Sequence, residues 1–401
     1  MRRLFALLTL LLAAAVRAQD APPDVPLPPP ASTDTASTDT AFVSMITVLP
    51  GDPSYARFGH TALRVYDPAQ GLDLMYNYGT FRFDATFLPK FVYGALDYEL
   101  SVVDFPLALR HYATVEERGV IEQRLRLSRA QQNSLAAFLD WNARPENAAY
   151  RYLFLDDNCT TRARDAVERV LGQPIGGTTV GRDGHPTYRD LLHPYQTGAP
   201  LLLLGTNLGL GARVDESASP RHAQFLPDVL MRDLDAATVG GQTLVSRTDT
   251  LVNLPRPAET AFPWTYVLTF VVLIVAFVQT LRTRAAPVVT RFDRALFGAT
   301  GVAGLLLAFL VFVSLHDVTR PNWNLAWALP THLVYAFAAG RGYRWLRPYA
   351  FAAGIATALF VLATPVLPQA IPLDILPVVA ALALRLFAHA GALPGPRSVA
   401  A

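Results

Sequence analysis

Apolar residues follow different patterns in the two halves of the chain. Between residues 41 and 171, short apolar runs, several of them bounded by turn residues, predict strands at 41–49, 60–66, 73–80, 116–126 and 150–155, and helical spacing predicts helices at 128–142 and 160–171. Turn signals at Asp67-Pro68 and Gly71 separate two of these strands. We interpret residues 41–254 as a water-soluble α+β domain. Its last part, 175–254, is rich in Gly, Thr and Pro, and one interpretation is loops that shape a substrate cleft.

From residue 262 the pattern changes to five apolar stretches, at 262–281, 295–315, 325–339, 349–367 and 373–388. The first, second and fourth reach the roughly twenty residues that a membrane helix needs. Arginines gather in three clusters that lie on one side if every stretch spans, at Arg282, Arg284, Arg291, Arg294, Arg341, Arg344, Arg347, Arg385 and Arg397. That side is expected to be cytoplasmic. We therefore predict an all-α, five-helix transmembrane domain at 262–390 and a cytoplasmic tail at 391–401.

The first forty residues are expected to lie outside the folded domains. Two arginines, an apolar run from Leu4 to Ala15 and small residues around Ala18 predict a signal peptide at 1–18, with a short membrane anchor as the alternative. Residues 19–40 are mostly Pro, Ala, Ser, Thr and Asp and predict a disordered linker. A signal peptide exports the next domain, which agrees with the side that the arginines indicate.

Composition supports a membrane location and argues against some functions. The chain of 401 residues is 52% hydrophobic and 16% charged, whereas about a quarter of a soluble domain is charged. The net charge of +2 argues against nucleic-acid binding. The sequence has no Cys/His cluster typical of a structural metal site, and we expect no cofactor.

The single cysteine, Cys159, is the strongest candidate for chemistry. It follows Asp157-Asn158, which predicts a helix cap, and the free amides at a helix start lower the pKa of a thiol. His60, at the start of a predicted strand, could act as its base, and a third polar group would orient the imidazole. The alternatives are a buried structural thiol and a half-exposed histidine on a strand edge.

A second polar feature lies between the second and third apolar stretches. His316 to Asn324 contains several polar side chains, among them His316 and Asn322, and the predicted topology places it on the side of the α+β domain. Two interpretations stay open: a substrate contact, or a solvated turn with an interfacial tryptophan.

Three strings give the chain a resemblance to a known family. They are Phe58-Gly59-His60-Thr61-Ala62, Tyr76-Asn77-Tyr78-Gly79-Thr80-Phe81 and Asp157-Asn158-Cys159-Thr160-Thr161-Arg162-Ala163-Arg164-Asp165. A histidine that precedes a helix-opening cysteine resembles the circularly permuted papain-like folds, such as the lecithin–retinol acyltransferase group. The strings resemble the Lnb-type bacterial apolipoprotein N-acyltransferases more closely, as do the His316 loop and Pro330-Thr331-His332.

The resemblance implies a permuted papain-like periplasmic domain, five membrane helices and a set of site residues. Cys159 would be the nucleophile and His60 its base, with Asn77 as the orienting group and Tyr78 as the alternative, because strand register cannot be read from sequence. The possible supporting residues are Asn158, Thr160, Arg162, Asp165, His316 and Asn322.

The implied reaction occurs at the periplasmic face of the bacterial inner membrane. Cys159 would take an acyl group from a phospholipid as a thioester and pass it to the α-amino group of a diacylglyceryl-cysteine on a lipoprotein. The expected partners are therefore a phospholipid donor, a lipoprotein acceptor and the membrane. Two other functions stay open: a thiol peptidase or amidase that acts on cell-wall peptides, and a membrane-tethered binding protein without catalysis.

Overall fold

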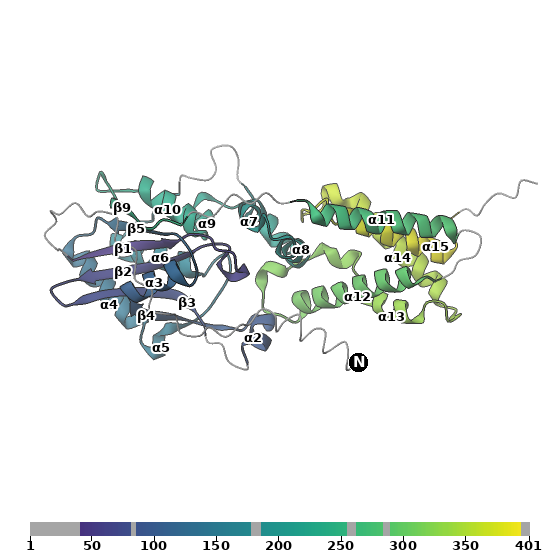
Figure 1. Cartoon of the computed structure of the whole chain (residues 1–401), viewed down its shortest axis with the longest axis horizontal. Helices are drawn as coiled ribbons and strands as arrows, with labels where there is room; N and C mark the ends of the chain where they lie inside the picture. The colour runs from purple at the N-terminus through teal and green to yellow at the C-terminus, as the bar shows by residue number, and fades with distance from the viewer. Residues whose placement is uncertain (1–40, 82–85, 178–185, 255–261, 284–288, 394–401) are drawn as a thin grey trace, which may run out of the picture.

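The computed structural model describes residues 41–81, 86–177, 186–254, 262–283 and 289–393, and it consists of a sheet domain followed by apolar helices (Figure 1). The two parts lie end to end along the longest axis of the molecule. The predicted signal peptide and linker, and residues 394–401 of the predicted tail, lie outside the described residues.

Seven strands of the described chain form one antiparallel sheet in the order β6-β4-β3-β2-β1-β5-β9. The strands are β1 (Phe42–Val48), β2 (His60–Asp67), β3 (Leu72–Thr80), β4 (Asp97–Asp104), β5 (Val120–Leu125), β6 (Ala149–Arg151) and β9 (Val245–Val252). The helices of this domain are α2 (Phe87–Tyr93), α3 (Phe105–Thr114), α4 (Arg129–Asn142), α5 (Pro145–Ala148), α6 (Cys159–Leu171), α7 (Tyr188–Gln196), α8 (Pro200–Gly209), α9 (Pro220–Ala223) and α10 (Pro227–Ala236), and a small hairpin joins β7 (Thr238–Val239) to β8 (Gln242–Thr243).

Both faces of the sheet are covered, and alternation decides which residue faces which helix. Leu63 of β2 belongs to a core with Leu135 of α4 and Val167 of α6. Its neighbour Ala62 belongs to a second core, with Phe105 of α3. His60, two residues before Ala62, therefore starts β2 on the α3 face of the sheet.

Several elements differ from the sequence prediction. The strand predicted at 150–155 shortens to Ala149–Arg151, and β4 was not predicted. Residues 175–254 contain helices and the edge strand β9 as well as loops, so the region has more regular structure than its composition indicates. β9 joins the sheet by pairing with β5, a long-range contact that its own composition does not indicate.

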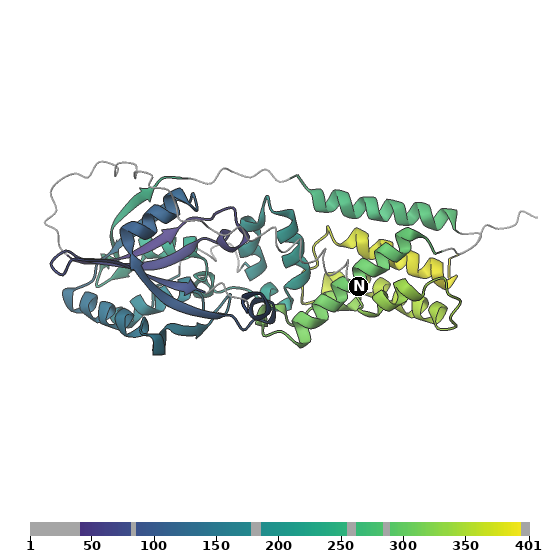
Figure 2. The same ribbon diagram turned by 60° about the horizontal axis from the view of Figure 1, so that its bottom comes forward.

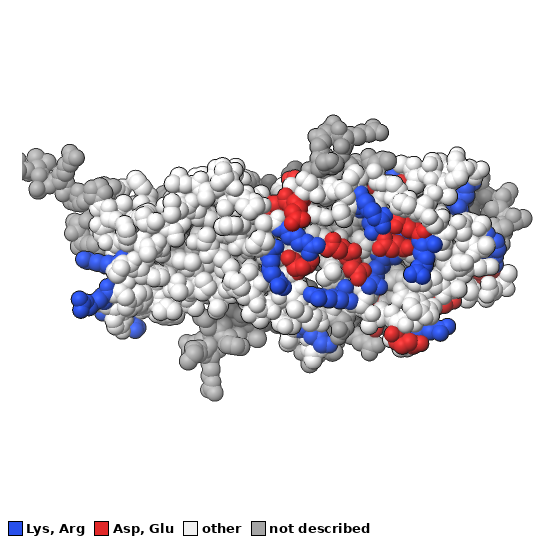
Figure 3. Space-filling view, turned by 180° about the vertical axis from the view of Figure 1, so that it is seen from behind, with Lys and Arg blue, Asp and Glu red and all other residues white. Residues whose placement is uncertain are grey.

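The second part contains the apolar helices α11 (Trp264–Arg282), α12 (Arg291–Phe312), α13 (Thr331–Ala338), α14 (Leu346–Ala363) and α15 (Leu376–Ala390). In the described chain, α11, α12 and α14 with its extension to Val366 are long and apolar enough to cross a membrane. Figure 3 shows an uncharged surface over most of this part, with basic side chains at its far end. α13 has 8 residues and α15 has 15, both fewer than the roughly twenty that a span needs, so five spans remain a prediction.

Arg385, which the sequence groups with the arginines on the cytoplasmic side, lies inside α15. It is fully buried and donates to both carboxylate oxygens of Asp293 on α12, at 2.6 and 2.9 Å. It also donates to the hydroxyl of Thr280 on α11 at 2.9 Å. One buried cation therefore holds three apolar helices together.

We expect the replacement Asp293→Ala to destabilise the helical part by about 3–5 kcal/mol, because it leaves the buried Arg385 without a counter-charge. Unfolding in detergent micelles measures this loss. The double replacement Asp293→Leu with Arg385→Leu removes both charges and should lose less stability than Asp293→Ala alone. A double variant that is less stable than the single one would contradict this assignment.

Candidate active site

A cavity of about 500 Å³ lies at the end of the sheet that faces the apolar helices, and it contains both Cys159 and His60. Aromatic residues form much of its wall, among them Phe58, Phe154 and Phe225. The chain thus brings together two residues that are far apart in sequence. What they can do depends on how each is held.

The cap of α6 positions Cys159. The side-chain oxygen of Asn158 accepts from the amides of Thr160 and Thr161, at 2.8 and 3.0 Å, and the hydroxyl of Thr161 accepts from the Asn158 amide at 2.8 Å. The Asn158 side-chain nitrogen donates to the carbonyl of Phe225 at 2.9 Å. Cys159 is the first residue of the helix, so its amide has no partner within the helix. That amide can donate to an oxyanion that forms next to the sulfur.

Asn77 orients His60. The Nε2 of His60 donates to Oδ1 of Asn77 at 2.5 Å, and the imidazole also hydrogen-bonds with Cys159. Since Nε2 is engaged by Asn77, the other ring nitrogen, Nδ1, is the one that can take the thiol proton. The register pairs Leu63 with Tyr76, so His60 and Asn77 lie on the same face. Tyr78 lies on the opposite face, where its hydroxyl donates to Asn142 at 2.7 Å, so the geometry favours Asn77 over Tyr78.

Gly79 permits the close approach of the thiol and the imidazole. The pairing of β3 with β4 has a bulge between Tyr78 and Thr80, and Gly79 has φ of +95° there. A Cβ on Gly79 would lie 3.7 Å from Cβ of Cys159 and 4.0 Å from Cε1 of His60. The bulge thus places a residue without a side chain between the two reacting groups.

The two groups shift each other's pKa. Burial works to raise the pKa of the Cys159 thiol, but the charge and hydrogen bond of His60, with the Thr61 amide and the Thr160 hydroxyl, lower it to about 7. Burial works to lower the pKa of His60, but Cys159 and the hydrogen bond with Asn77 raise it overall. Each shift favours the charged form, so a thiolate–imidazolium pair is accessible near neutral pH.

We expect the rate of Cys159 alkylation by iodoacetamide to rise with pH around a midpoint of about 7. The replacement His60→Ala removes the charge and hydrogen bond that lower this pKa and leaves burial, so the midpoint should move upward. Mass spectrometry of the alkylated protein follows the rate. His222→Ala, at an exposed histidine on α9, is the matched control and should keep the midpoint of the unchanged protein. An unchanged midpoint in His60→Ala would contradict the pairing.

The structure adds a residue that the sequence did not indicate. The hydroxyl of Tyr150 is buried and has no hydrogen-bond partner among the described residues, and it would lie 3.9 Å from a Cβ on Gly79. It therefore shares the point at which Cys159 and His60 meet. Burial, with the neighbouring Cys159, raises the pKa of Tyr150, so its hydroxyl stays protonated and can donate. Only its place close before the cysteine string hinted at a role.

The possible supporting residues differ in their distance from the pair of Cys159 and His60. Thr160 Oγ1 lies 3.8 Å from the Cys159 sulfur. Arg162 forms two hydrogen bonds with Asp157 and lies over the ring of Tyr150 at 3.7 Å, so it contacts Tyr150 and does not line the cavity. Asp165 pairs with Arg164 and Arg221 and does not line the cavity.

His316 and Asn322 do not line the cavity either, so the structure does not support a direct contact of this loop with the thiol. His316 Nε2 donates to the carbonyl of Phe91 at 3.0 Å, and Asn322 donates to the carbonyl of Leu208 at 2.7 Å. The loop therefore holds α2 and α8, which is a role that neither interpretation of the sequence contained.

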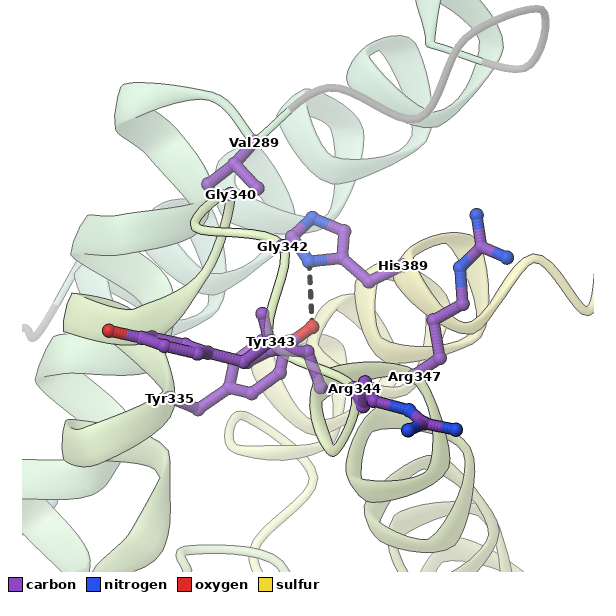
Figure 4. Close-up of a pocket in the computed structure, with 9 residues that line it drawn as sticks. Val289, Tyr335, Gly340, Gly342, Tyr343, Arg344, Arg347 and His389 are labelled. Carbon is purple, nitrogen blue, oxygen red and sulfur yellow. Dashed lines mark hydrogen bonds between the residues drawn. The ribbon is translucent and has the colours of Figure 1, made fainter.

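A second cavity, of about 450 Å³, lies in the helical part (Figure 4). Tyr335, Tyr343, Arg344, Arg347 and His389 line it, and the Tyr335 hydroxyl donates to Nδ1 of His389 at 3.0 Å. Since Cys159, the single cysteine, lines the first cavity, we place the candidate chemistry in that first cavity.

The fold and the site define a membrane protein whose sheet domain carries a Cys–His–Asn arrangement. Two family models match the chain: the Lnb N-terminal periplasmic domain at residues 29–193 and the Lnb transmembrane domain at residues 258–392. The chain belongs to the Lnb family and is a membrane protein with a periplasmic domain, which confirms the resemblance. No curated protein and no solved structure matches it significantly.

Proposed function

We propose that the protein is an N-acyltransferase of lipoproteins, with its active site on the periplasmic face of the inner membrane. The observation that carries this proposal is the hydrogen-bonded series Cys159, His60 and Asn77 in an apolar cavity beside the membrane part. A thiol paired with an imidazole and an orienting amide can form and cleave acyl bonds. An apolar wall suits a lipid acyl chain. We also propose that the sheet domain is a permuted papain-like fold.

The first half of the proposed reaction forms a thioester. His60 takes the thiol proton, and the thiolate attacks the carbonyl carbon of a phospholipid ester. The new C–S bond replaces the ester C–O bond, and the imidazolium returns its proton to the departing lysophospholipid oxygen. The amide of Cys159 and the hydroxyl of Tyr150 donate to the oxyanion of the tetrahedral intermediate.

The second half transfers the acyl group. The α-amino group of a diacylglyceryl-cysteine attacks the thioester carbon and loses a proton to His60. The C–N bond replaces the C–S bond, and the thiolate recovers the proton from the imidazolium. The protein returns to its starting state, with an amide-linked acyl chain on the lipoprotein as product.

Mass spectrometry of lipoprotein N-termini from cells tests this function. We expect three acyl chains where the protein is present and two where it is deleted, or where it carries Cys159→Ser. Deletion in a strain with no other lipoprotein N-acyltransferase gives the sharpest comparison. Unchanged N-termini together with altered muropeptides would contradict the proposal and favour the peptidase.

The replacement Tyr150→Phe is expected to lower the rate of acyl transfer by about a hundredfold, as loss of one oxyanion donor does. The pH midpoint of Cys159 alkylation should stay near 7, since Tyr150 is not among the groups that lower this pKa. Rate measurements with a phospholipid donor, alongside alkylation, separate the two effects. Full activity in Tyr150→Phe would exclude its hydroxyl from the reaction.

A further inference from the structure

Two short helices of the sheet domain reach the cavity from the side of the membrane part. Phe91 of α2 and Leu202 of α8 both line the cavity that holds Cys159. Both views of the ribbon show α8 and α2 between the sheet and the apolar helices (Figures 1 and 2). The wall of the reaction site therefore extends toward the membrane.

α8 has the surface of an element that lies against lipid. It begins Pro-Leu-Leu-Leu-Leu, and its Leu201 side chain is 84% exposed. Leu204 and Leu208 pack against the core of the apolar helices, so α8 is continuous with the membrane part. Exposed leucine side chains beside membrane spans cost no free energy in lipid, whereas their exposure to water is unfavourable.

α2 has the same character. Phe91, Val92 and Tyr93 are all exposed, although each is a large apolar or aromatic side chain. Aromatic residues of this kind are favoured at the interface between a membrane and water. α2 and α8 thus expose apolar surface at the same end of the sheet domain.

The loop before α13 fixes both helices to the membrane part. Besides the bond from His316 to Phe91, the Leu315 amide donates to the carbonyl of Tyr93 at 2.7 Å. Asn322 donates to the carbonyls of Leu208 and Gly209, at 2.7 and 3.1 Å. These are among the last carbonyl groups of each helix, which have no amide donors within the helix. The loop therefore sets the height of α2 and α8 relative to the apolar spans.

We propose that α2 and α8 lie in the outer surface of the bilayer and form the entrance through which a phospholipid acyl chain reaches Cys159. This inference rests on the proposed function for the reaction of the acyl chain at Cys159, and it adds the path by which the acyl chain arrives there. The ligand is the acyl chain of a membrane phospholipid, which Leu202 and Phe91 contact. Leu201 faces the surrounding lipid. The ester carbonyl stops at the thiol, and the remaining methylenes stay in apolar surroundings along the path.

The test uses the full chain in vesicles of phosphatidylethanolamine and phosphatidylglycerol that contain a phospholipid with an alkyne-tagged acyl chain. The measured quantity is the rate at which the tag appears on Cys159. A small water-soluble ester, 4-nitrophenyl acetate, serves as a donor that does not need the entrance. The variants are Leu201→Glu and Leu202→Glu. The matched control is Leu107→Glu, an exposed leucine on α3, which packs against the sheet.

We expect Leu202→Glu to lower acylation from the phospholipid by about tenfold or more, because a charge opposes the passage of the chain. Leu201→Glu should lower it in the same direction. Acetylation by the small ester should stay within about twofold of the unchanged protein in Leu201→Glu, whose side chain does not line the cavity, as should both rates in Leu107→Glu. Unchanged phospholipid rates in Leu201→Glu and Leu202→Glu would overturn the proposed route.

A measurement without turnover separates this inference from the proposed function. The variant Cys159→Ala is irradiated in vesicles with a phospholipid that carries a diazirine on its acyl chain. Adducts on peptides that contain Phe91 and Leu202 support the entrance, even if the unchanged protein takes no acyl group. Adducts confined to the long apolar helices would overturn it.

Discussion

Replacing Cys159 with alanine is expected to abolish acyl transfer, with a fall of about a millionfold, the scale that loss of a catalytic nucleophile produces. Without the sulfur no thioester forms, and His60 has no proton to accept. Cys159→Ser should fail in the same direction, since a hydroxyl ionises far less readily than a thiol whose pKa lies at about 7. Transfer of a labelled acyl chain to a diacylglyceryl peptide measures the loss.

Both variants should keep the fold, because the change removes or replaces a single atom at the edge of the core. Unfolding curves that match those of the unchanged protein are the control. Appreciable transfer by Cys159→Ala would show that the thiol is not the acyl carrier. A protein that only binds its lipid ligand would retain binding in both variants and have no activity to lose.

The second large effect is expected for Gly79→Val. A side chain at φ of +95° strains the backbone by about 1–2 kcal/mol. Its branches would also enter the space between Cys159 and His60, where a Cβ already touches both. Misplacement of reacting groups by an ångström can cost about a hundredfold in rate, and we expect at least that loss.

Gly71→Val is the matched control. Gly71 also has a positive φ, of +66°, but a Cβ on Gly71 would have no atom of the described chain within 4 Å, so the variant has similar strain away from the site. We expect it to lose some stability and to keep its rate of acyl transfer. Equal loss of activity in both variants would attribute the effect to strain alone, and full activity in Gly79→Val would contradict the role of the bulge.

Much of the central sheet could be predicted because β2 and β3 are rich in apolar and aromatic residues and Asp67-Pro68 and Gly71 mark the turn between them. β9 and the helices after residue 175 could not. These elements are stabilised by long-range pairing and by contacts with other elements, and the local sequence does not indicate either. The apolar helices were readable from composition, whereas the buried pair of Arg385 and Asp293 required the three-dimensional structure, because charge alone does not reveal a partner.

Part of the candidate site, like part of the fold, could be predicted from the sequence. Asp157-Asn158 before Cys159 predicts a helix start, and the cap that forms uses Asn158. The choice between Asn77 and Tyr78 required the register of β3 against β2, which the sequence does not fix. Leu202 lines the cavity, and the Tyr150 hydroxyl lies beside Gly79, through contacts that no motif indicates. The polarity of the loop around His316 was visible, but its partners are backbone carbonyls, which every residue has.

The most direct test of a thioester at Cys159 is the intact mass of the protein after incubation with phospholipid vesicles and no acceptor. We predict a mass increase of one acyl chain, located on the peptide with Cys159, removed by hydroxylamine and absent from Cys159→Ala. Protein of unchanged mass, or an acyl chain attached to another residue, would contradict the account.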